Sequence, residues 1–138
     1  MRFMIIVKAT AETEKEVAGT IPDQELMAAM AAFHEEMARA GVLLDGAGLQ
    51  PSNKGWRIHH SGNKIKVTDG PFAETKELIA GYTLIQVRTR DEALEWSRRF
   101  PNPVGAGMEA DIEVRQLYEL EDFGETETTQ RFRDIGMS

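Results

Sequence analysis

Two short segments of the chain, residues 3–8 and 79–88, have the pattern of β-strands but carry apolar side chains on both faces. Their apolar residues are Phe3, Met4, Ile5, Ile6 and Val7 in the first segment and Ile79, Tyr82, Leu84, Ile85 and Val87 in the second. Successive side chains of a strand point to opposite faces of its sheet, so both faces of these two strands need to be buried. The pattern therefore predicts that they are the central strands of a sheet that is covered on both sides.

Two further segments have the periodicity of amphipathic helices. The first is expected to begin where Thr20 and Asp23 resemble a capping box and to end at Gly41. Its apolar stripe consists of Leu26, Met30, Phe33 and Met37. The second helix is expected at residues 90–100, after a capping box that begins at Thr89. Each helix has one apolar face that needs a sheet to pack on.

The remaining strand patterns complete an α+β fold. Residues 42–44 begin a second strand, residues 56–60 and 64–68 form a β-hairpin, and residues 111–119 alternate as a half-exposed strand does. The element order is β-α-β, hairpin, β-α-β, which is the ferredoxin-like split β-α-β with an inserted hairpin. Because two helices cover only one face of such a sheet, the other apolar face predicts a homodimer that packs sheet against sheet.

The composition sets the domain limits. The chain has 138 residues, of which 41% are hydrophobic, and this suits one domain. We expect that domain to cover residues 1–120, with residues 9–20 as a loop. From residue 121 the chain is polar with scattered apolar residues. Residues 121–138 are therefore expected to be a mobile tail, or an arm that orders only against a partner.

Charge and residue usage exclude several classes of function. The net charge of −7 argues against nucleic-acid binding, because an acidic chain repels phosphate backbones. No run of about 18 apolar residues is present, so no membrane span is predicted. The chain has no cysteine, which excludes disulfides, thiolate metal sites and cysteine nucleophiles. A chain without cysteines also fits a cytoplasmic location.

The sequence Asp-Gly-Pro-Phe at residues 69–72 predicts a tight turn. Turn formation alone explains Asp69, since its side chain can bond its own backbone. The alternative is a site carboxylate that faces a cleft, with Phe72 and Tyr82 as an apolar wall for a small ligand. Neither alternative is excluded by the sequence.

This turn and the residues around it resemble the DGPF group of the YCII-related (YciI-like) proteins. The resemblance rests on Asp-Gly-Pro-Phe at 69–72, its continuation Ala-Glu-Thr-Lys-Glu at 73–77, Gly81-Tyr82, and further matches within residues 41–51 and 91–96. It covers roughly residues 1–120. The resemblance implies a dimeric α+β barrel, in agreement with the element order.

Two other residues are candidates for chemistry. His34 lies at the edge of the first helix's apolar stripe, where it is either a locally hydrogen-bonded boundary residue or a general base. Some YCII-related proteins use a His–Asp pair, but the spacing from His34 to the second strand differs from that of shorter YciI-like chains. Asp45, at the end of the second strand, is either a turn residue or a group that orients a histidine or accepts a hydrogen bond from a ligand. Because the adjacent His59 and His60 point to opposite faces of a strand, no metal site is predicted.

Two functions remain open. The first is an enzyme that acts on a small organic molecule by proton transfer at the dimer cleft, without a bound cofactor, with His34 or Asp69 as the reacting group. Related YCII proteins include one that dehalogenates an aromatic compound. The second is a non-catalytic ligand-binding or regulatory module, because DGPF proteins are often encoded near extracytoplasmic-function sigma factors.

Overall fold

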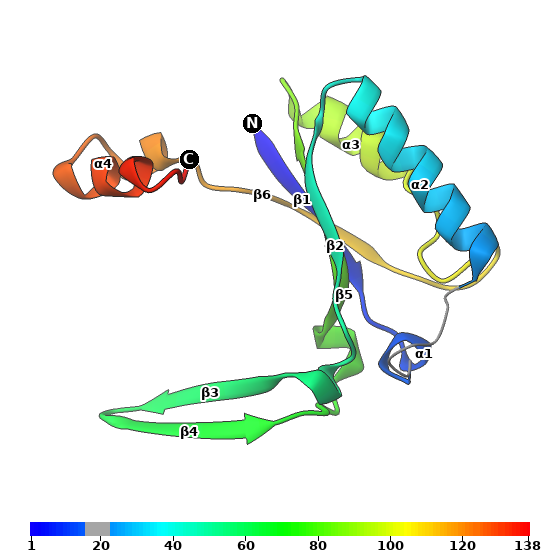
Figure 1. Cartoon of the computed structure of the whole chain (residues 1–138), viewed down its shortest axis with the longest axis horizontal. Coiled ribbons are helices and arrows are strands. Elements are labelled where there is room, and N and C mark those ends of the chain that lie inside the picture. Colours follow the sequence, from blue (N-terminus) through cyan, green and yellow to red (C-terminus); the bar gives the residue numbers. More distant parts are fainter. Residues whose placement is uncertain (16–22) are drawn as a thin grey trace.

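Four antiparallel strands form a sheet with two helices on one face (Figure 1), in a computed structural model that describes residues 1–15 and 23–138. The strands are β1 (Arg2–Lys8), β2 (Leu43–Gly48), β5 (Ile79–Gln86) and β6 (Ile112–Gln116). Their order in the sheet is β2-β5-β1-β6. The prediction that residues 3–8 and 79–88 are the central strands is confirmed, and so is the ferredoxin-like α+β fold.

The central strands bury one of their two apolar faces within the chain. Phe3 and Ile5 of β1 lie beside Ile85 and Thr83 of β5 in the antiparallel register, and all four side chains are buried. They form a core with residues of the two helices, which are Phe33, Met37 and Ala93. The opposite face of the sheet carries side chains that stay half-buried in this chain, among them Met4, Ile6 and Leu84.

Helix α2 (Gln24–Arg39) begins at Asp23, whose carboxylate accepts a hydrogen bond of 2.9 Å from the Glu25 N–H. Thr20, the other residue of the expected capping box, lies outside the described residues. The helix ends before Gly41, which has the positive φ of 76° expected of a C-terminal cap. The predicted end at Gly41 is confirmed, and the N-cap is Asp23, the second residue of the expected capping box.

The apolar stripe of α2 has two parts. Phe33 and Met37 are buried in the core, whereas Leu26 and Met30, one to two turns earlier, are only half-buried. Helix α3 (Arg90–Arg98) covers the rest of the same sheet face, and its Trp96 ring lies 6.0 Å from the Phe33 ring. The first half of the α2 stripe is therefore left to line a cavity.

Two parts of the chain form helices that the sequence did not predict. Helix α1 (Ala11–Glu14) lies within the expected loop 9–20, and the tail contains η3 (Leu120–Phe123) and α4 (Glu127–Asp134). The loop prediction for residues 11–14 was wrong, because α1 is a single turn fixed by a capping box rather than by an apolar stripe. Among the helices of the described residues, none is long and apolar enough to cross a membrane.

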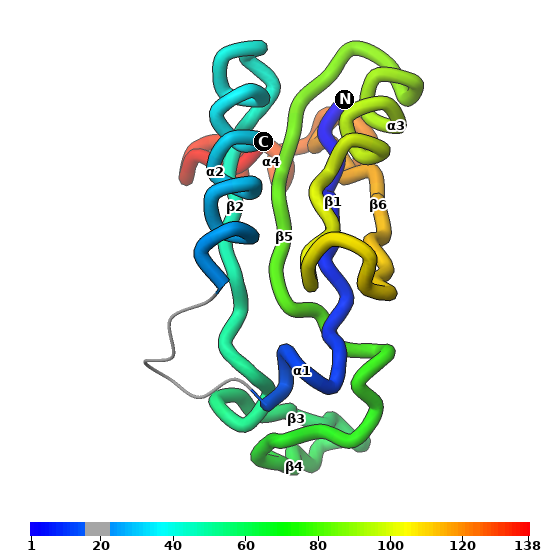
Figure 2. Tube along the Cα trace, turned by 90° about the vertical axis from the view of Figure 1, so that its right-hand side faces the viewer, coloured from blue at the N-terminus to red at the C-terminus, as the bar shows by residue number. Residues whose placement is uncertain are grey.

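The inserted hairpin consists of β3 (Trp56–Ser61) and β4 (Lys64–Asp69), which form a separate two-stranded sheet as predicted. It projects from one end of the main sheet, toward the side opposite α2 and α3 (Figure 1). Seen from the helix side, α2 and α3 lie in front of the sheet and α4 lies behind it (Figure 2). The hairpin and the C-terminal residues thus extend beyond the uncovered face of the sheet.

The base of the hairpin is fixed by the Asp-Gly-Pro-Phe turn and by η1 (Ser52–Lys54). A Cβ atom on Gly70 would lie 1.8 Å from the carbonyl oxygen of Ser52. The Ser52 hydroxyl accepts a hydrogen bond of 3.0 Å from the Phe72 N–H and donates one to the Glu14 carboxylate. Gly70 does not have a positive φ, so its backbone conformation does not require glycine. Glycine is needed at this position because two backbone segments touch there.

We predict that Gly70→Ala destabilises the protein, because the added methyl group has no space beside the Ser52 backbone. Overpacking of this kind typically costs about 1–3 kcal/mol, so the melting temperature should fall by several degrees. Gly48→Ala is the control, because a Cβ atom at Gly48 would meet nothing within 4 Å. Equal melting temperatures for the two variants would contradict this account of the turn.

Candidate functional site

A cavity of about 510 Å³ lies on the helix side of the sheet. Its lining comes mainly from α2, the end of β2 and the residues after it, the first half of β5, α1, and the segment after α3. The apolar residues of the lining are Val7, Leu26, Met27, Met30, Ala47, Leu49, Pro51, Ile79, Ala80, Phe100 and Pro103. Its volume is within the range of about 300–1,000 Å³ that is usual for small-molecule sites.

Few polar side chains reach this cavity. They include His34 and Thr83 at the core end, and Glu14 and Gln50 from the segments around η1 and α1. Mostly apolar walls with a small number of polar groups are typical of sites for small organic molecules.

His34 is held by one hydrogen bond at each ring nitrogen. Its Nδ1 lies 2.7 Å from the carbonyl oxygen of Met30, one turn earlier in α2, and its Nε2 lies 2.8 Å from the Thr83 hydroxyl. The ring also makes an edge contact with Phe100, with 6.1 Å between the ring centres. These contacts fix both the position and the rotation of the imidazole.

The Met30 carbonyl determines which nitrogen of His34 carries the hydrogen. A carbonyl oxygen only accepts, so Nδ1 must donate and therefore keeps its hydrogen in both charge states of the ring. In the neutral ring, Nε2 then accepts from the Thr83 hydroxyl. If the ring takes up a proton at Nε2, the same hydroxyl can turn and accept instead. The pair can thus take up and release a proton without losing its hydrogen bond.

Gly46 of β2 lies next to this pair. A Cβ atom at position 46 would lie 3.6 Å from the Nε2 of His34 and 3.6 Å from the Thr83 hydroxyl oxygen. A larger side chain would therefore occupy the space beside the basic nitrogen. The register between β2 and β5 shifts between Leu43 and Asp45, so the strand pairing is irregular just before Gly46.

Asp45 and Tyr82 meet at a different place. The Tyr82 hydroxyl donates a hydrogen bond of 3.1 Å to the Asp45 carboxylate. Because side chains alternate along β5, the Tyr82 side chain points to the uncovered face of the sheet while Thr83 points to the helices. The hydrogen bond to Asp45, and secondarily its negative charge, raises the pKa of Tyr82 above its usual value. Asp45 therefore lies beside Tyr82 rather than beside His34.

Asp69 and Phe72 lie at the base of the hairpin. Asp69 is exposed and pairs with Trp56 across the β3–β4 ladder. Within the described part of the chain, its carboxylate has no hydrogen-bond partner. Phe72 is half-buried, with the Arg57 guanidinium 3.8 Å from the centre of its ring. The five residues singled out from the sequence are thus distributed over three places. Of these, His34 and Tyr82 line the cavity, and the Tyr82 side chain points to the other face of the sheet.

Sequence reasoning missed Thr83, Glu14 and Ser52. Thr83 is a polar residue at a core-facing position of a strand that is otherwise apolar, and this was the available signal, because a buried hydroxyl needs a hydrogen-bond partner. Glu14 and Ser52 meet across 38 residues of chain, and nothing in their local sequence indicates that contact. In the described residues, no three His, Asp or Glu side chains are grouped so that they could hold a metal ion.

A four-stranded split β-α-β sheet with two helices on one face defines a ferredoxin-like α+β protein, and in this chain a cavity lies under the first long helix. The family model of the YCII-related domain matches residues 1–118, and the chain therefore belongs to the YCII-related family.

A curated relative is an uncharacterised protein of Rhizobium meliloti (strain 1021), which is 38% identical over 80 residues. The aligned part is 58% of this chain and 64% of the length of that relative. The relative carries no assigned activity, so the comparison supports the family without adding a reaction.

We predict that Tyr82 ionises at higher pH than an ordinary tyrosine, whose pKa is 10.0, and that Asp45→Asn lowers the midpoint. The raised pKa favours the neutral phenol in the folded state, so this contribution to stability is present below the usual tyrosine pKa and is lost as the pH rises through that of Tyr82. Tyr118 is the other tyrosine of the chain, so phenolate absorbance in a Tyr118→Phe background reports Tyr82 alone. An unchanged midpoint in Asp45→Asn would show that the hydrogen bond is not formed in solution.

Proposed function

We propose that this protein is an enzyme that transfers a proton on a small, largely apolar organic molecule, with His34 as the base. The observation that carries the proposal is the pair of hydrogen bonds on the His34 ring. Its Nδ1 is bound to a carbonyl that only accepts, which makes Nε2, at the cavity, the nitrogen that can take a proton.

The lining of the cavity indicates the class of substrate. Leu26, Met30 and Phe100 favour a ring or a branched hydrocarbon, and Glu14 and Gln50 offer one polar end. The volume of about 510 Å³ suits a molecule of modest size. A substrate with an acidic C–H or O–H next to a polar group fits both features.

The proposed step uses the Thr83 hydroxyl as a partner in both protonation states. Substrate binding turns this hydroxyl away from Nε2, the lone pair of Nε2 takes the substrate proton, and the hydroxyl then accepts from the imidazolium N–H. The electron pair of the broken bond stays on the substrate as an enolate-like or alkoxide-like anion. Return of the proton to the same or another atom of the substrate completes an exchange or an isomerisation.

The proposed site differs from the one expected from the sequence, which was the cleft between the two sheets of a dimer. The cavity lies under α2, on the side of the sheet where Thr83 points, whereas Asp45 and Tyr82 meet on the other side. The rival function, a non-catalytic ligand-binding or regulatory module, would use the same cavity. The two functions differ in whether the bound molecule is turned over.

The test is a screen of small aromatic and branched carbonyl compounds by thermal shift, followed by NMR of each hit in D₂O with catalytic amounts of protein. We expect a hit to raise the melting temperature of the wild type and to exchange hydrogen for deuterium next to its carbonyl group. His34→Gln should abolish the exchange, because glutamine can form hydrogen bonds but cannot act as a base near neutral pH.

His59→Gln is the matched control, because His59 lies on the exposed hairpin and does not line the cavity. It should bind and exchange as the wild type does. Loss of exchange in both His34→Gln and His59→Gln would show that the loss is not specific to His34, and this would contradict the proposal. A hit that binds in a His34-dependent way without any exchange in the wild type would favour the non-catalytic ligand-binding module.

A further inference from the structure

The carboxylate of Glu14 lies at the end of the cavity away from His34. Glu14 is the last residue of α1, and its side chain is half-buried. Among the described residues that line the cavity, Glu14 is the one acidic side chain, and none is a lysine or an arginine. The charge of this lining is therefore set by Glu14 together with the protonation state of His34.

The local fold of α1 gives Glu14 a defined position. Thr10 and Thr13 form a capping box, in which the Thr13 N–H donates to the Thr10 hydroxyl at 3.2 Å and the Thr10 N–H donates to the Thr13 hydroxyl at 2.8 Å. Just before it, the Ala9 N–H donates a hydrogen bond of 3.0 Å to the carbonyl oxygen of Leu78, next to β5. A single turn is too short to be stable by itself, so these contacts are what hold it in place.

Ser52 fixes the carboxylate of Glu14. The Ser52 N–H donates a hydrogen bond of 3.0 Å to Oε1, and the Ser52 hydroxyl donates one to Oε2. The same hydroxyl accepts a hydrogen bond of 3.0 Å from the Phe72 N–H, and the backbone of Ser52 lies against Gly70. The Asp-Gly-Pro-Phe turn is thus connected to the cavity, because it positions Ser52, which positions Glu14.

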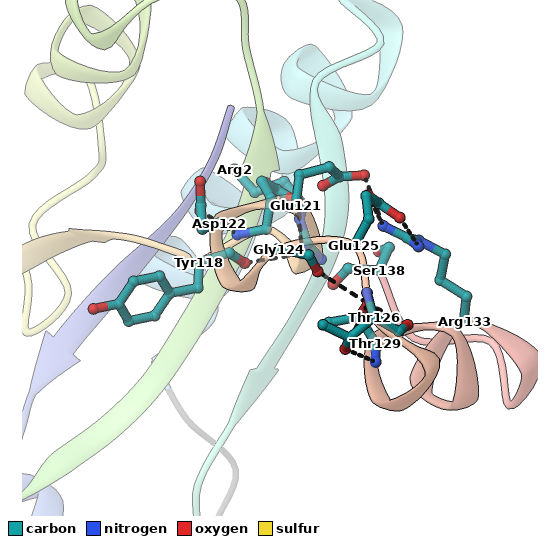
Figure 3. Close-up of polar contacts among 11 residues, drawn as sticks. Arg2, Tyr118, Glu121, Asp122, Gly124, Glu125, Thr126, Thr129, Arg133 and Ser138 are labelled. Carbon is teal, nitrogen blue, oxygen red and sulfur yellow. Dashed lines mark hydrogen bonds and ion pairs between the residues drawn. The ribbon is translucent and has the colours of Figure 1, made fainter.

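The groups that hold Glu14 are neutral. Elsewhere in the chain a carboxylate is paired with a cation: Glu125 accepts two hydrogen bonds of 2.9 Å from the guanidinium of Arg133 (Figure 3). In the described part of the chain, the partners of the Glu14 carboxylate are a backbone N–H and a hydroxyl, and neither carries a charge. Its position is therefore fixed without a positive charge beside it.

The carboxylate of Glu14 can accept further hydrogen bonds. An ionised carboxylate has about four acceptor positions, and the two donor groups of Ser52 leave some of them free. It cannot donate, so a ligand group that meets it must be a donor. A protonated amine gains the most, because hydrogen bonds between charged groups are the stronger ones. A ligand carboxylate would bring two negative charges together in a mostly apolar cavity.

The other polar groups of the cavity do not reverse this preference. The amide of Gln50 both donates and accepts, so it does not discriminate by charge. The neutral ring of His34 donates its Nδ1 hydrogen to the Met30 carbonyl and accepts at Nε2, which leaves no spare donor for an anion. Near and above neutral pH, the lining thus favours donors at the Glu14 end.

We propose that Glu14 is the specificity-determining residue of the cavity and selects a ligand that carries a protonated amino group on an apolar body. The amino group binds the Glu14 carboxylate, and the apolar body lies along Leu26 and Met30 toward His34. A hydroxyl group binds more weakly at the same place, and a carboxylate is excluded. The inference rests on the proposed function for its site, but it concerns binding and does not require that the ligand is turned over.

Three compounds with the same ring and chain test the preference, and they are phenylpropylamine, phenylpropanol and phenylpropanoate. Their dissociation constants are measured by ¹⁵N–¹H NMR titration at about pH 8, where an imidazole is neutral. Ligands of this size are expected to bind with constants of about a millimolar. We expect the wild type to bind the amine at least about tenfold more tightly than the alcohol, and the carboxylate most weakly of the three.

Glu14→Gln keeps the shape of the side chain and removes its charge. It should weaken binding of the amine about tenfold and leave binding of the alcohol nearly unchanged. Glu12→Gln is the matched control, because Glu12 belongs to the same helix, is exposed and does not line the cavity. It should leave all three constants unchanged. Ser52→Ala should reduce the preference for the amine over the alcohol, because Glu14 then loses the hydroxyl that orients it.

The order of the three compounds on the wild type decides the proposal even where a variant does not fold, which its melting temperature shows. An amine that binds no more tightly than the carboxylate, an amine without detectable binding, or equal weakening in Glu14→Gln and Glu12→Gln would each overturn it. His34→Gln should keep the preference for the amine while it loses hydrogen exchange. Failure of the proposed proton transfer is therefore distinguishable from failure of the selectivity.

Discussion

The central strands β1 and β5 carry apolar side chains on both faces, and this requirement for two covers shapes the molecule. Helices α2 and α3 provide the first cover, over Phe3, Ile5 and Ile85. Residues 1–15 and 23–138 leave the face with Met4, Ile6 and Leu84 half-buried, and a hairpin and a C-terminal segment extend beyond that face (Figure 1). The same constraint that fixes the sheet order therefore leaves one face of β1 and β5 only half-buried.

The candidate site follows from the same strands. Alternation along β5 sends Thr83 toward the helices and Tyr82 to the other face, which separates the His34–Thr83 pair from the Tyr82–Asp45 pair. On the helix side, the apolar stripe of α2 extends beyond the core, so Leu26 and Met30 line a cavity instead of packing. An imidazole at the boundary between core and cavity can be fixed by the backbone of its own helix and still reach a ligand.

Much of the fold could be predicted from the sequence, because β1, β5 and α2 have strong periodic patterns. The helices α1 and α4 could not, since they depend on local caps and carry no apolar stripe. His34 was recognised by its residue type and its place on the helix. Its partners were not, because the contact with Thr83 spans 49 residues and depends on the pairing of β5 with its neighbours. The Asp-Gly-Pro-Phe motif lies where β4 ends and the chain bends at Gly70, but the close backbone contact between Gly70 and Ser52 is a tertiary feature that the motif does not reveal.

The central claim is that His34 is held with its hydrogen on Nδ1, so that Nε2 is the basic nitrogen at the cavity. Long-range ¹⁵N–¹H correlation NMR of the histidine rings at alkaline pH, where imidazoles are neutral, distinguishes the two tautomers directly. His34→Gln assigns the signal, since the chain has three histidines. We expect the neutral His34 ring to be protonated at Nδ1, with an unprotonated, pyridine-like Nε2 that accepts a hydrogen bond from the Thr83 hydroxyl. A ring protonated at Nε2, or one that averages between both tautomers, would contradict it.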